Sequence, residues 1–286
     1  MSQAAGAPGG HPACATATIA LSVVSHGHGM QVRQLLALLL APSASPVHRI
    51  WLTLNVEEPG LEQELATLHG RSRHEGLPQL RFIRNPSPQG FGANHNQAFE
   101  HEQACSDAAP YFAVVNPDIT WQHSPWASLL GAAAQPGAGC AYPRQVGAQG
   151  REQDYARALP SPWALLRRHW SGRARAQRHA PVRSPDWVNA ALLLFHGGVY
   201  RKLGGFDTAY HMYCEDVDIC LRLQLAGYRL VLAEEACVIH EAGRASRRVL
   251  RHLGWHLRSL LRLWASPAYR QYLALKRRRG PVVASG

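Results

Sequence analysis

Short apolar runs alternate with segments of helical spacing over residues 18–118. The apolar runs, which we expect to be strands, are residues 18–25, 48–55, 80–85 and 111–118. Helical spacing occupies residues 30–41, residues 59–70 and the segment GFGANHNQAFEHEQA. This order favours a parallel sheet with helices on both faces. Ligands of such sheets bind at the carboxyl ends of the strands.

Composition bounds the size of the core and the charge of a partner. The chain has 286 residues, of which 46% are hydrophobic and 17% are charged. Such a chain can bury its core as one large domain, or as one domain with appendages. The net charge of +11 indicates an acidic partner. Nucleic acid, an anionic membrane surface and a phosphorylated small molecule all meet that description, and charge alone does not choose among them.

Cysteine spacing and apolar run lengths indicate the compartment. The six cysteines are scattered without a C-x-x-C pair, which is typical of a reduced intracellular protein. Residues 1–16 are rich in Ala, Gly and Pro and lack a signal-peptide pattern, so we expect a disordered lead-in. Apolar runs such as residues 35–41 are far shorter than the roughly 20 residues of a spanning helix. We therefore expect a cytoplasmic protein, either soluble or peripheral on the inner face of the cell membrane.

Polar residues stand at the expected carboxyl ends of all these strands. They are Ser25, His26, Asn55, Asn85, Asn116 and Asp118. Each type is common in turns, so each residue alone has a purely structural explanation. Their occurrence at every strand end favours a ligand site. Asp118 suits a Mg²⁺ or Mn²⁺ ion that bridges two phosphates; the alternative is that it caps a helix at residues 124–134.

Glu215, Asp216 and Asp218 lie within four positions of the segment HMYCEDVDIC. One interpretation is that they complement the dipole of a helix that begins there. The other is catalytic, because a carboxylate in a tight, aromatic-lined setting can have a raised pKa and act as a base toward a hydroxyl. His240, in a short strand expected at residues 237–243, could be a metal ligand, a phosphate donor or a structural histidine.

Five segments occur in a recognisable order: GFGANHNQAF, NPDI, WVNAALLLFHGGVYRKLGGFD, YHMYCEDVDICLRLQLAGYRL and VIHEAG. They resemble the family 2 glycosyltransferases of the GT-A fold, most of all the rhamnosyltransferase-type enzymes of bacterial surface polysaccharide assembly. The resemblance spans residues 18–243. The glycine loop is a weak signature by itself, whereas GGFD followed by EDVD is a strong one. The implied fold is α/β, a Rossmann-like, mostly parallel sheet with helices on both faces.

The resemblance also implies roles for single residues. Asp216 matches the catalytic base of an inverting transfer, and Glu215 and Asp218 would support acceptor binding and orient that base. Asp118 and His240 match residues that hold Mg²⁺ or Mn²⁺ on the donor diphosphate. The residues implied in binding the nucleotide-sugar are Ser25, Asn55, Glu57, Gly92, Asn94, Asn96 and Asn116.

Two strand ends depart from the family pattern. Family members often carry an aspartate at the end of the second strand that reads the nucleobase. This chain has LNVEEPG there, so that Asn55, Glu57 and Glu58 are the substitutes. The first strand ends in SHGH instead of a polar pair such as Tyr-Asn. These departures concern the identity of the donor. They also leave a further interpretation, in which the chain is a family member that binds its ligands but does not transfer the sugar.

The rest of the chain is less regular. Residues 167–183 are basic and interrupted by Gly and Pro, which predicts a loop over the site. Residues 187–195 read as one strand. Residues 247–280 have an apolar helical stripe with arginines elsewhere. The stripe consists of Leu250, Leu253, Leu257, Leu260, Leu261 and Trp264. It either binds the anionic inner leaflet of a membrane or packs on the domain.

We therefore expect a lead-in (1–16), a glycosyltransferase domain (17–243) and a basic amphipathic helical tail (244–286). Within the domain, residues 17–120 would bind the nucleotide-sugar and residues 121–243 the acceptor. The leading hypothesis is a metal-dependent, inverting transfer to a glycan acceptor carried on a lipid. The alternative is a nucleic-acid- or anion-binding protein. We expect no nucleic-acid partner, because carboxylates at the sheet edge would repel phosphates and no nucleic-acid-binding motif is present.

Overall fold

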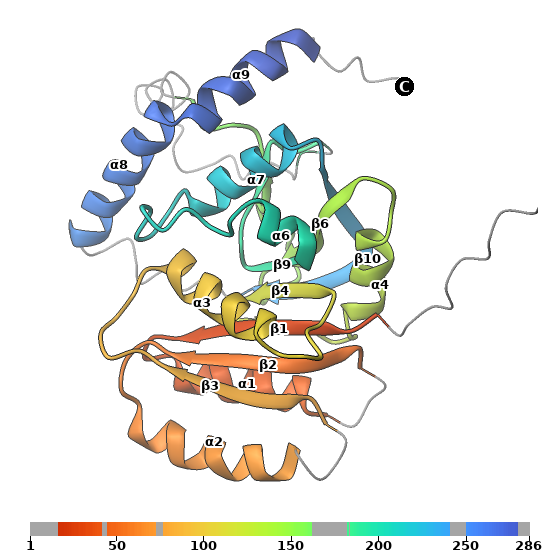
Figure 1. Ribbon diagram of the computed structural model, residues 1–286, viewed down its shortest axis with the longest axis vertical. Helices are drawn as coiled ribbons and strands as arrows, with labels where there is room; N and C mark the ends of the chain where they lie inside the picture. Colours follow the sequence, from red (N-terminus) through yellow and green to blue (C-terminus); the bar gives the residue numbers. More distant parts are fainter. Residues whose placement is uncertain are drawn as a thin grey trace, which may run out of the picture.

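The computed structural model describes residues 17–41, 45–72, 77–161, 182, 184–240 and 250–279. The predicted lead-in, most of the predicted loop at 167–183 and residues 241–249 lie outside this part. The main feature is an eight-stranded sheet in the order β3-β2-β1-β4-β9-β6-β10-β5, with helices on both faces (Figure 1). The expected α/β architecture is confirmed.

The first half is the predicted parallel unit. Its strands are β1 (Ile19–Ser25), β2 (Val47–Leu54), β3 (Gln79–Arg84) and β4 (Tyr111–Val115). Its helices are α1 (Gly29–Leu39), α2 (Pro59–Ser72) and α3 (Phe91–Gln103). β1 pairs in parallel with both β2 and β4, so the strand order reverses beside β1. A crevice at the carboxyl end of such a reversal is the usual ligand position in open α/β sheets.

The second half is mixed. Its strands are β5 (Ile119–Thr120), β6 (Ala138–Val146), β7 (Ala156–Arg157), β8 (Trp187–Val188), β9 (Leu192–His196) and β10 (Arg229–His240). Its helices are α4 (Trp126–Ala133), α6 (Gly197–Lys202) and α7 (Glu215–Leu225). β9 runs antiparallel to both neighbours, β4 and β6, whereas β6 and β10 are parallel. The sheet is therefore mostly parallel, with β9 reversed near its centre and β5 reversed at its edge.

Two predicted strands differ from the structure. Residues 187–195 were expected as one strand, but they divide into β8, which pairs with β7 in a small second sheet, and β9. The division falls at Asn189, because its side-chain amide exchanges two hydrogen bonds with that of Gln145, at 2.6 and 3.0 Å. The strand expected separately at 237–243 is the end of β10, which continues through a register shift between Ala233 and Cys237.

Buried apolar residues form a cluster on each face of the sheet. One cluster packs α1, α2 and α4 against the strands, around Leu35, Leu65 and Trp126. The other packs α3, α6 and α7 against the opposite face, with Phe112 and Tyr200 near its centre. The two clusters explain why the central strands β1 and β4 read as continuous apolar runs, since both of their sides are covered.

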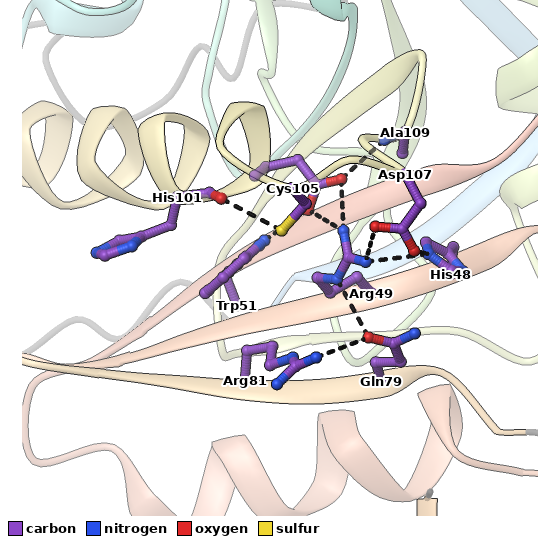
Figure 2. A network of polar contacts seen from close by, with 10 residues as sticks. His48, Arg49, Trp51, Gln79, Arg81, His101, Cys105, Asp107 and Ala109 are labelled. Carbon is purple, nitrogen blue, oxygen red and sulfur yellow. Dashed lines mark hydrogen bonds and ion pairs between the residues drawn. The ribbon is translucent and has the colours of Figure 1, made fainter.

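A buried ion pair fastens the helical layer to the start of β2 (Figure 2). The guanidinium of Arg49 donates to both carboxylate oxygens of Glu102 at 2.9 Å, and both side chains are at most 2% exposed. Glu102 also accepts from the indole N–H of Trp51 at 2.7 Å and from the backbone N–H of Ala109 at 2.8 Å. Of the other two Arg49 nitrogens, Nη2 donates to Asp107 at 2.8 Å and Nε to Gln79 at 3.4 Å. This network lies at the amino end of β2, away from the expected ligand edge.

The predicted tail forms two helices, α8 (Leu250–Ala265) and α9 (Pro267–Arg279). Leu260, Leu263 and Tyr272 are buried in the same cluster as α7. The indole of Trp264 donates to the carbonyl of Pro160 at 3.0 Å. The packing interpretation therefore applies to this part of the stripe, whereas Leu257 and Leu261 stay exposed.

A buried carboxylate holds α9 on the domain. Asp186 accepts hydrogen bonds from the Tyr272 hydroxyl at 2.9 Å and from the Lys276 ammonium at 2.5 Å. Within the described residues, no helix combines the length and apolar character that crossing a bilayer requires.

Candidate active site

A network of amides closes the carboxyl ends of β2 and β3. Asn85 donates to the side-chain oxygens of Asn55, at 2.8 Å, and Asn94, at 2.6 Å. Asn55 also exchanges hydrogen bonds with the backbone of Gln89, and Asn94 donates to the carbonyl of Gly90. Asn55 and Asn94 are buried. Their amides therefore fix the loop in front of α3, and through it the shape of the edge where the sequence expects the nucleotide.

Glu58 is the acidic side chain that the structure brings to the end of β1. Its carboxylate accepts from the hydroxyl of Ser25 at 2.5 Å and from the backbone N–H of Gly27 at 3.1 Å. Ser25 is fully buried, so its hydroxyl positions this carboxylate. Glu57, which the sequence reasoning preferred, points into solvent. Glu58 was named only as a substitute for the strand-two aspartate, and spacing alone did not separate it from its neighbour.

The glycines of the loop before α3 are required by close packing. A Cβ on Gly92 would lie 2.6 Å from the Cβ of Phe206, and one on Gly90 would lie 2.6 Å from the carbonyl oxygen of His211. The backbone N–H of Phe91 donates to that same carbonyl at 3.1 Å. The loop therefore seats against the residues that precede α7.

Asn96 joins the two halves of the sheet's helical layer. Its side-chain oxygen accepts from the Tyr200 hydroxyl at 2.7 Å and the Phe206 N–H at 2.9 Å, while its nitrogen donates to the Phe206 carbonyl at 2.8 Å. The side chain of Asn96 therefore binds the GGFD turn (residues 204–207) and does not lie at the strand ends.

Asp118 and His240 come together across two paired strands. Ile119 and Thr120 of β5 pair antiparallel with His240 and Ile239 of β10. This register brings Asp118 to the end of β10, with its Oδ2 atom 3.5 Å from Nε2 of His240. The N-cap of α4 is Pro125, so the expectation that Asp118 caps this helix is wrong.

The chemistry of this pair fits a divalent cation. Oxygen and imidazole nitrogen are ligands that Mn²⁺ accepts, and Mg²⁺ or Mn²⁺ commonly takes one or two protein groups, with phosphates and water completing the shell. The Nδ1 atom of His240 is buried and has no hydrogen-bond partner, and its carbonyl accepts from Gln153 at 2.7 Å. Across the described part of the chain, no three His, Cys, Asp or Glu side chains form a complete metal site.

The acidic cluster begins α7 directly after a rare backbone conformation. Tyr213 and Cys214 have φ angles of 73° and 67°, in the left-handed region that non-glycine residues seldom adopt. Glu215 follows and is buried, with its Oε2 atom lacking a hydrogen-bond partner. Desolvation and the charge of Asp216 raise the pKa of Glu215. The chain thus turns sharply to present two adjacent carboxylates at a helix start.

The pKa of Asp216 is raised by burial, but neighbouring groups limit the increase. Desolvation raises the pKa of Asp216, while backbone hydrogen bonds from Val217 and Ala190 and the charge of Arg157 lower it. The Val217 N–H lies 2.8 Å from its carboxylate oxygen. Arg157 is held over the ring of Trp187, 5.0 Å from the centroid. Arg157 was missed because residues 140–180 showed no period from which to place it.

A single turn connects Asp216 with the Asp118 segment. The backbone of Ala190 lies near enough to the Asp216 carboxylate to lower its pKa. The carbonyl of the next residue, Ala191, accepts from the backbone N–H of Asn116 at 2.8 Å. Asn116 is half-buried, two residues before Asp118. One short piece of backbone, Ala190 and Ala191, therefore contacts both the acidic cluster and the segment that leads to Asp118.

Asp218 faces away from this turn. It accepts from Arg222 Nε at 2.6 Å, and the other nitrogens of Arg222 donate to the carbonyls of Leu203 and Gly205 at 2.7 and 2.9 Å. Asp218 therefore neutralises an arginine that holds the GGFD turn.

Comparisons with known proteins agree with this architecture. Residues 139–278 match the family model described as "Glycosyl transferase family group 2". The N-acetylglucosaminyl-diphospho-decaprenol L-rhamnosyltransferase of Mycobacterium tuberculosis is 28% identical over 263 residues, 85% of this chain and 83% of the relative. The rhamnosyltransferase WbbL of Escherichia coli K12 is 39% identical over 93 residues, 32% of each chain.

A solved structure shares the fold. The crystal structure of GalNAc-T7 with UDP, GalNAc and Mn²⁺ matches with a TM-score of 0.57 and 16% identity. The match covers 78% of this chain and 43% of the GalNAc-T7 chain, so it concerns less than half of that protein. These matches show that residues 139–278 form a domain of glycosyl transferase family 2 and that the chain has the GT-A fold.

Proposed function

We propose that the chain transfers a sugar, with inversion, from a nucleotide-sugar to a hydroxyl group of a lipid-linked glycan. The observation that carries the proposal is the short connection between Asp216 and Asp118 through Ala190 and Ala191. A general base and a cation ligand joined through one short turn suit a single displacement, in which acceptor and leaving group occupy opposite faces of the anomeric carbon.

In this mechanism Asp216 is the base. The acceptor hydroxyl gives its proton to the Asp216 carboxylate as its oxygen bonds to the anomeric carbon. The bond between that carbon and the diphosphate oxygen breaks, and the nucleoside diphosphate leaves with the electron pair. Glu215, whose pKa is raised, is the protonated member of the pair over a wider pH range and can donate a hydrogen bond to the acceptor.

The donor would bind along the edge that the amide network shapes. Asp118 and His240 would hold Mg²⁺ or Mn²⁺, which when bound supplies positive charge to the diphosphate. Glu58, fixed by Ser25, is the carboxylate best positioned to accept from a ribose or nucleobase. In this proposal Asn55, Gly92, Asn94 and Asn96 act by positioning the loop and the turn, and Asn116 by its backbone.

The acceptor class is inferred from a relative. The mycobacterial protein is named for a diphospho-decaprenol acceptor and for L-rhamnosyl transfer. We infer an acceptor of that chemical kind, a sugar on a lipid diphosphate, and a deoxyhexose donor. Such a substrate would place the enzyme at the inner face of the cell membrane, in the synthesis of a surface polysaccharide.

The donor site is tested by thermal shift with a panel of nucleoside diphosphates and nucleotide-sugars, each with and without Mn²⁺ or Mg²⁺. A ligand at 100 times its Kd adds about 2.7 kcal/mol to the free energy of unfolding. We expect one nucleotide to raise Tm in a metal-dependent way, and Asp118→Ala to lose the effect. The control Glu64→Gln changes an exposed carboxylate on α2 and should keep it. A shift with nucleic acid and none with any nucleotide would contradict the proposal.

The base and the stereochemistry are tested by turnover. Asp216→Asn should lower kcat by 10²-fold or more, about the contribution of a positioned base, while leaving the nucleotide thermal shift intact. The anomeric configuration of the product, measured by NMR, should be opposite to that of the donor. Unchanged turnover would remove Asp216 from the mechanism, and retained configuration would rule out a single displacement.

A further inference from the structure

Helix α8 has an outer face that the domain leaves uncovered. Leu257 and Leu261 are each 56% exposed, and they lie one helical turn apart. The opposite face of α8 is the buried one, with Ser259, Leu260 and Leu263. Few large apolar side chains in the described residues are this exposed, and two of them are neighbours on α8. We call Leu257, Arg258 and Leu261 the outer face of α8.

The charged side chains of α8 and α9 are all basic, although one of them, Arg262, is paired with Asp207 of the domain at 3.0 Å. Residues 250–279 contain arginine, lysine and histidine but no Asp or Glu. Arg258 is exposed beside the two leucines, and Arg270, Arg277 and Arg278 are exposed along α9. Exposed leucines flanked by arginines are typical of a helix that lies in the interface of an anionic bilayer. A second copy of this chain would bring like charges together on such a face, which disfavours self-association.

Helix α8, which carries the outer face, contacts the segment that leads into the candidate active site. On α8, the ring of Trp255 lies 4.9 Å from that of His211, and His211 accepts from the backbone of Phe91 at the start of α3. Figure 1 shows α8 on the side of the molecule toward which the arrowheads of β1, β2 and β3 point. A surface that bound this face would therefore meet the protein beside the segment leading into Glu215 and Asp216.

We propose that the outer face of α8 docks the protein on an anionic lipid bilayer. Leu257 and Leu261 enter the headgroup region, and Arg258 contacts the phosphates. Docking in this orientation presents the acceptor side of the site to the membrane. That last consequence rests on the proposed lipid-linked acceptor, whereas binding to lipid does not.

The test is co-sedimentation of the full chain with vesicles of phosphatidylethanolamine and phosphatidylglycerol, compared with phosphatidylcholine vesicles. We expect binding to the anionic vesicles that weakens with salt. Leu257→Ser and Leu261→Ser should each lower the partition coefficient about tenfold, and Arg258→Gln about fivefold. The matched controls are Met30→Ser, at a residue 71% exposed on α1, and Arg84→Gln on β3, and both should bind as the parent does.

Equal binding by the leucine variants and the parent would overturn the proposal, as would equal binding to neutral vesicles. A dimer in sedimentation velocity that Leu257→Ser dissolves would overturn it in favour of self-association. Transfer assays separate the two proposals. If the chain binds anionic vesicles as expected but glycosylates no lipid-linked acceptor, the proposed function is wrong and the docking proposal stands. If the leucine variants transfer normally to a water-soluble acceptor but slowly to one in vesicles, both hold.

Discussion

The hydroxyl of Ser259 on α8 donates a hydrogen bond of 2.9 Å to the backbone carbonyl of Met212. The next two residues, Tyr213 and Cys214, have the left-handed conformation that leads into the acidic cluster. The ring of Tyr213 also lies 5.1 Å from that of His256. The tail therefore supports a strained segment, and the strain persists because contacts from α8 hold it.

Loss of this hydrogen bond should loosen the start of α7. We expect Ser259→Ala to lower kcat about two- to tenfold, corresponding to about 0.5–1.5 kcal/mol for one hydrogen bond, with little change in the KM of the donor. Steady-state kinetics with each substrate varied would measure the split. Ser259→Thr keeps the hydroxyl and should restore kcat. Equal losses in both variants would mean that the packing of Ser259 matters and its hydrogen bond does not.

Glu215 should make stability depend on pH. The pKa of Glu215 is raised in the folded state above the value of about 4.3 in an unfolded chain. Between these two values the folded protein keeps the proton and the unfolded chain has released it, so stability is greatest at low pH and falls as pH rises. Glu215→Gln should remove this loss, about 1.4 kcal/mol for each pH unit within the window.

Urea unfolding of the parent and Glu215→Gln from pH 5 upward measures this effect. The relevant quantity is the change with pH in the difference between the two free energies, because a buried glutamine has a constant cost of its own. Glu234→Gln, at an exposed position on β10, is the control and should follow the parent. A constant difference between Glu215→Gln and the parent would show that Glu215 is ionised throughout.

Arg157 should set the acid limb of the pH–rate profile. Its positive charge lowers the pKa of Asp216 against the effect of desolvation. Arg157→Gln should therefore raise that pKa, so that the rise of kcat/KM with pH occurs at higher pH. The profile of Arg144→Gln, an exposed arginine paired with Glu152, should match the parent. If the limb does not move in Arg157→Gln, Arg157 is not the charge that keeps the base ionised.

Breaking the Arg49–Glu102 pair should be costly for stability. Arg49→Met leaves the Glu102 carboxylate buried without its charge partner, and such changes cost about 3–5 kcal/mol. The loss should appear as a lower midpoint in urea. Arg81→Met, on the exposed side of β3, is the control. A cost below about 1 kcal/mol would mean that the Trp51 and Ala109 hydrogen bonds suffice to hold Glu102.

The first half of the fold could be predicted from the sequence because β1, β2 and β4 are covered on both faces, whereas β3, at the sheet edge, keeps one exposed side. β1 and β4 therefore read as apolar runs, and α1 to α3 have helical spacing. The second half was less readable. β7 and β8 have two residues each, and β10 contains Glu234 and Glu235 in its interior, where a register shift accommodates them. A bulge of this kind has no periodic signature.

The candidate site was predictable in part. The sequence indicated the carboxylates at strand and helix ends, because a strand end has a recognisable position in the chain. It did not distinguish Glu57 from Glu58, since that choice is made by the Ser25 hydroxyl and the Gly27 N–H, which are distant from Glu58 in the sequence. It also did not indicate that Asp218 pairs with Arg222, because that pairing depends on which side of α7 faces the GGFD turn.

The three hydrogen bonds of Asn96 limit how this protein can be recombined with its relatives. Asn96 belongs to the first half of the chain, yet its side chain completes a turn that the second half supplies. A chimera that exchanges everything after β4 would pair this asparagine with a foreign turn. Grafting a new acceptor specificity onto this chain therefore requires that α3 travel with the grafted half, so that the two modules remain matched at this residue.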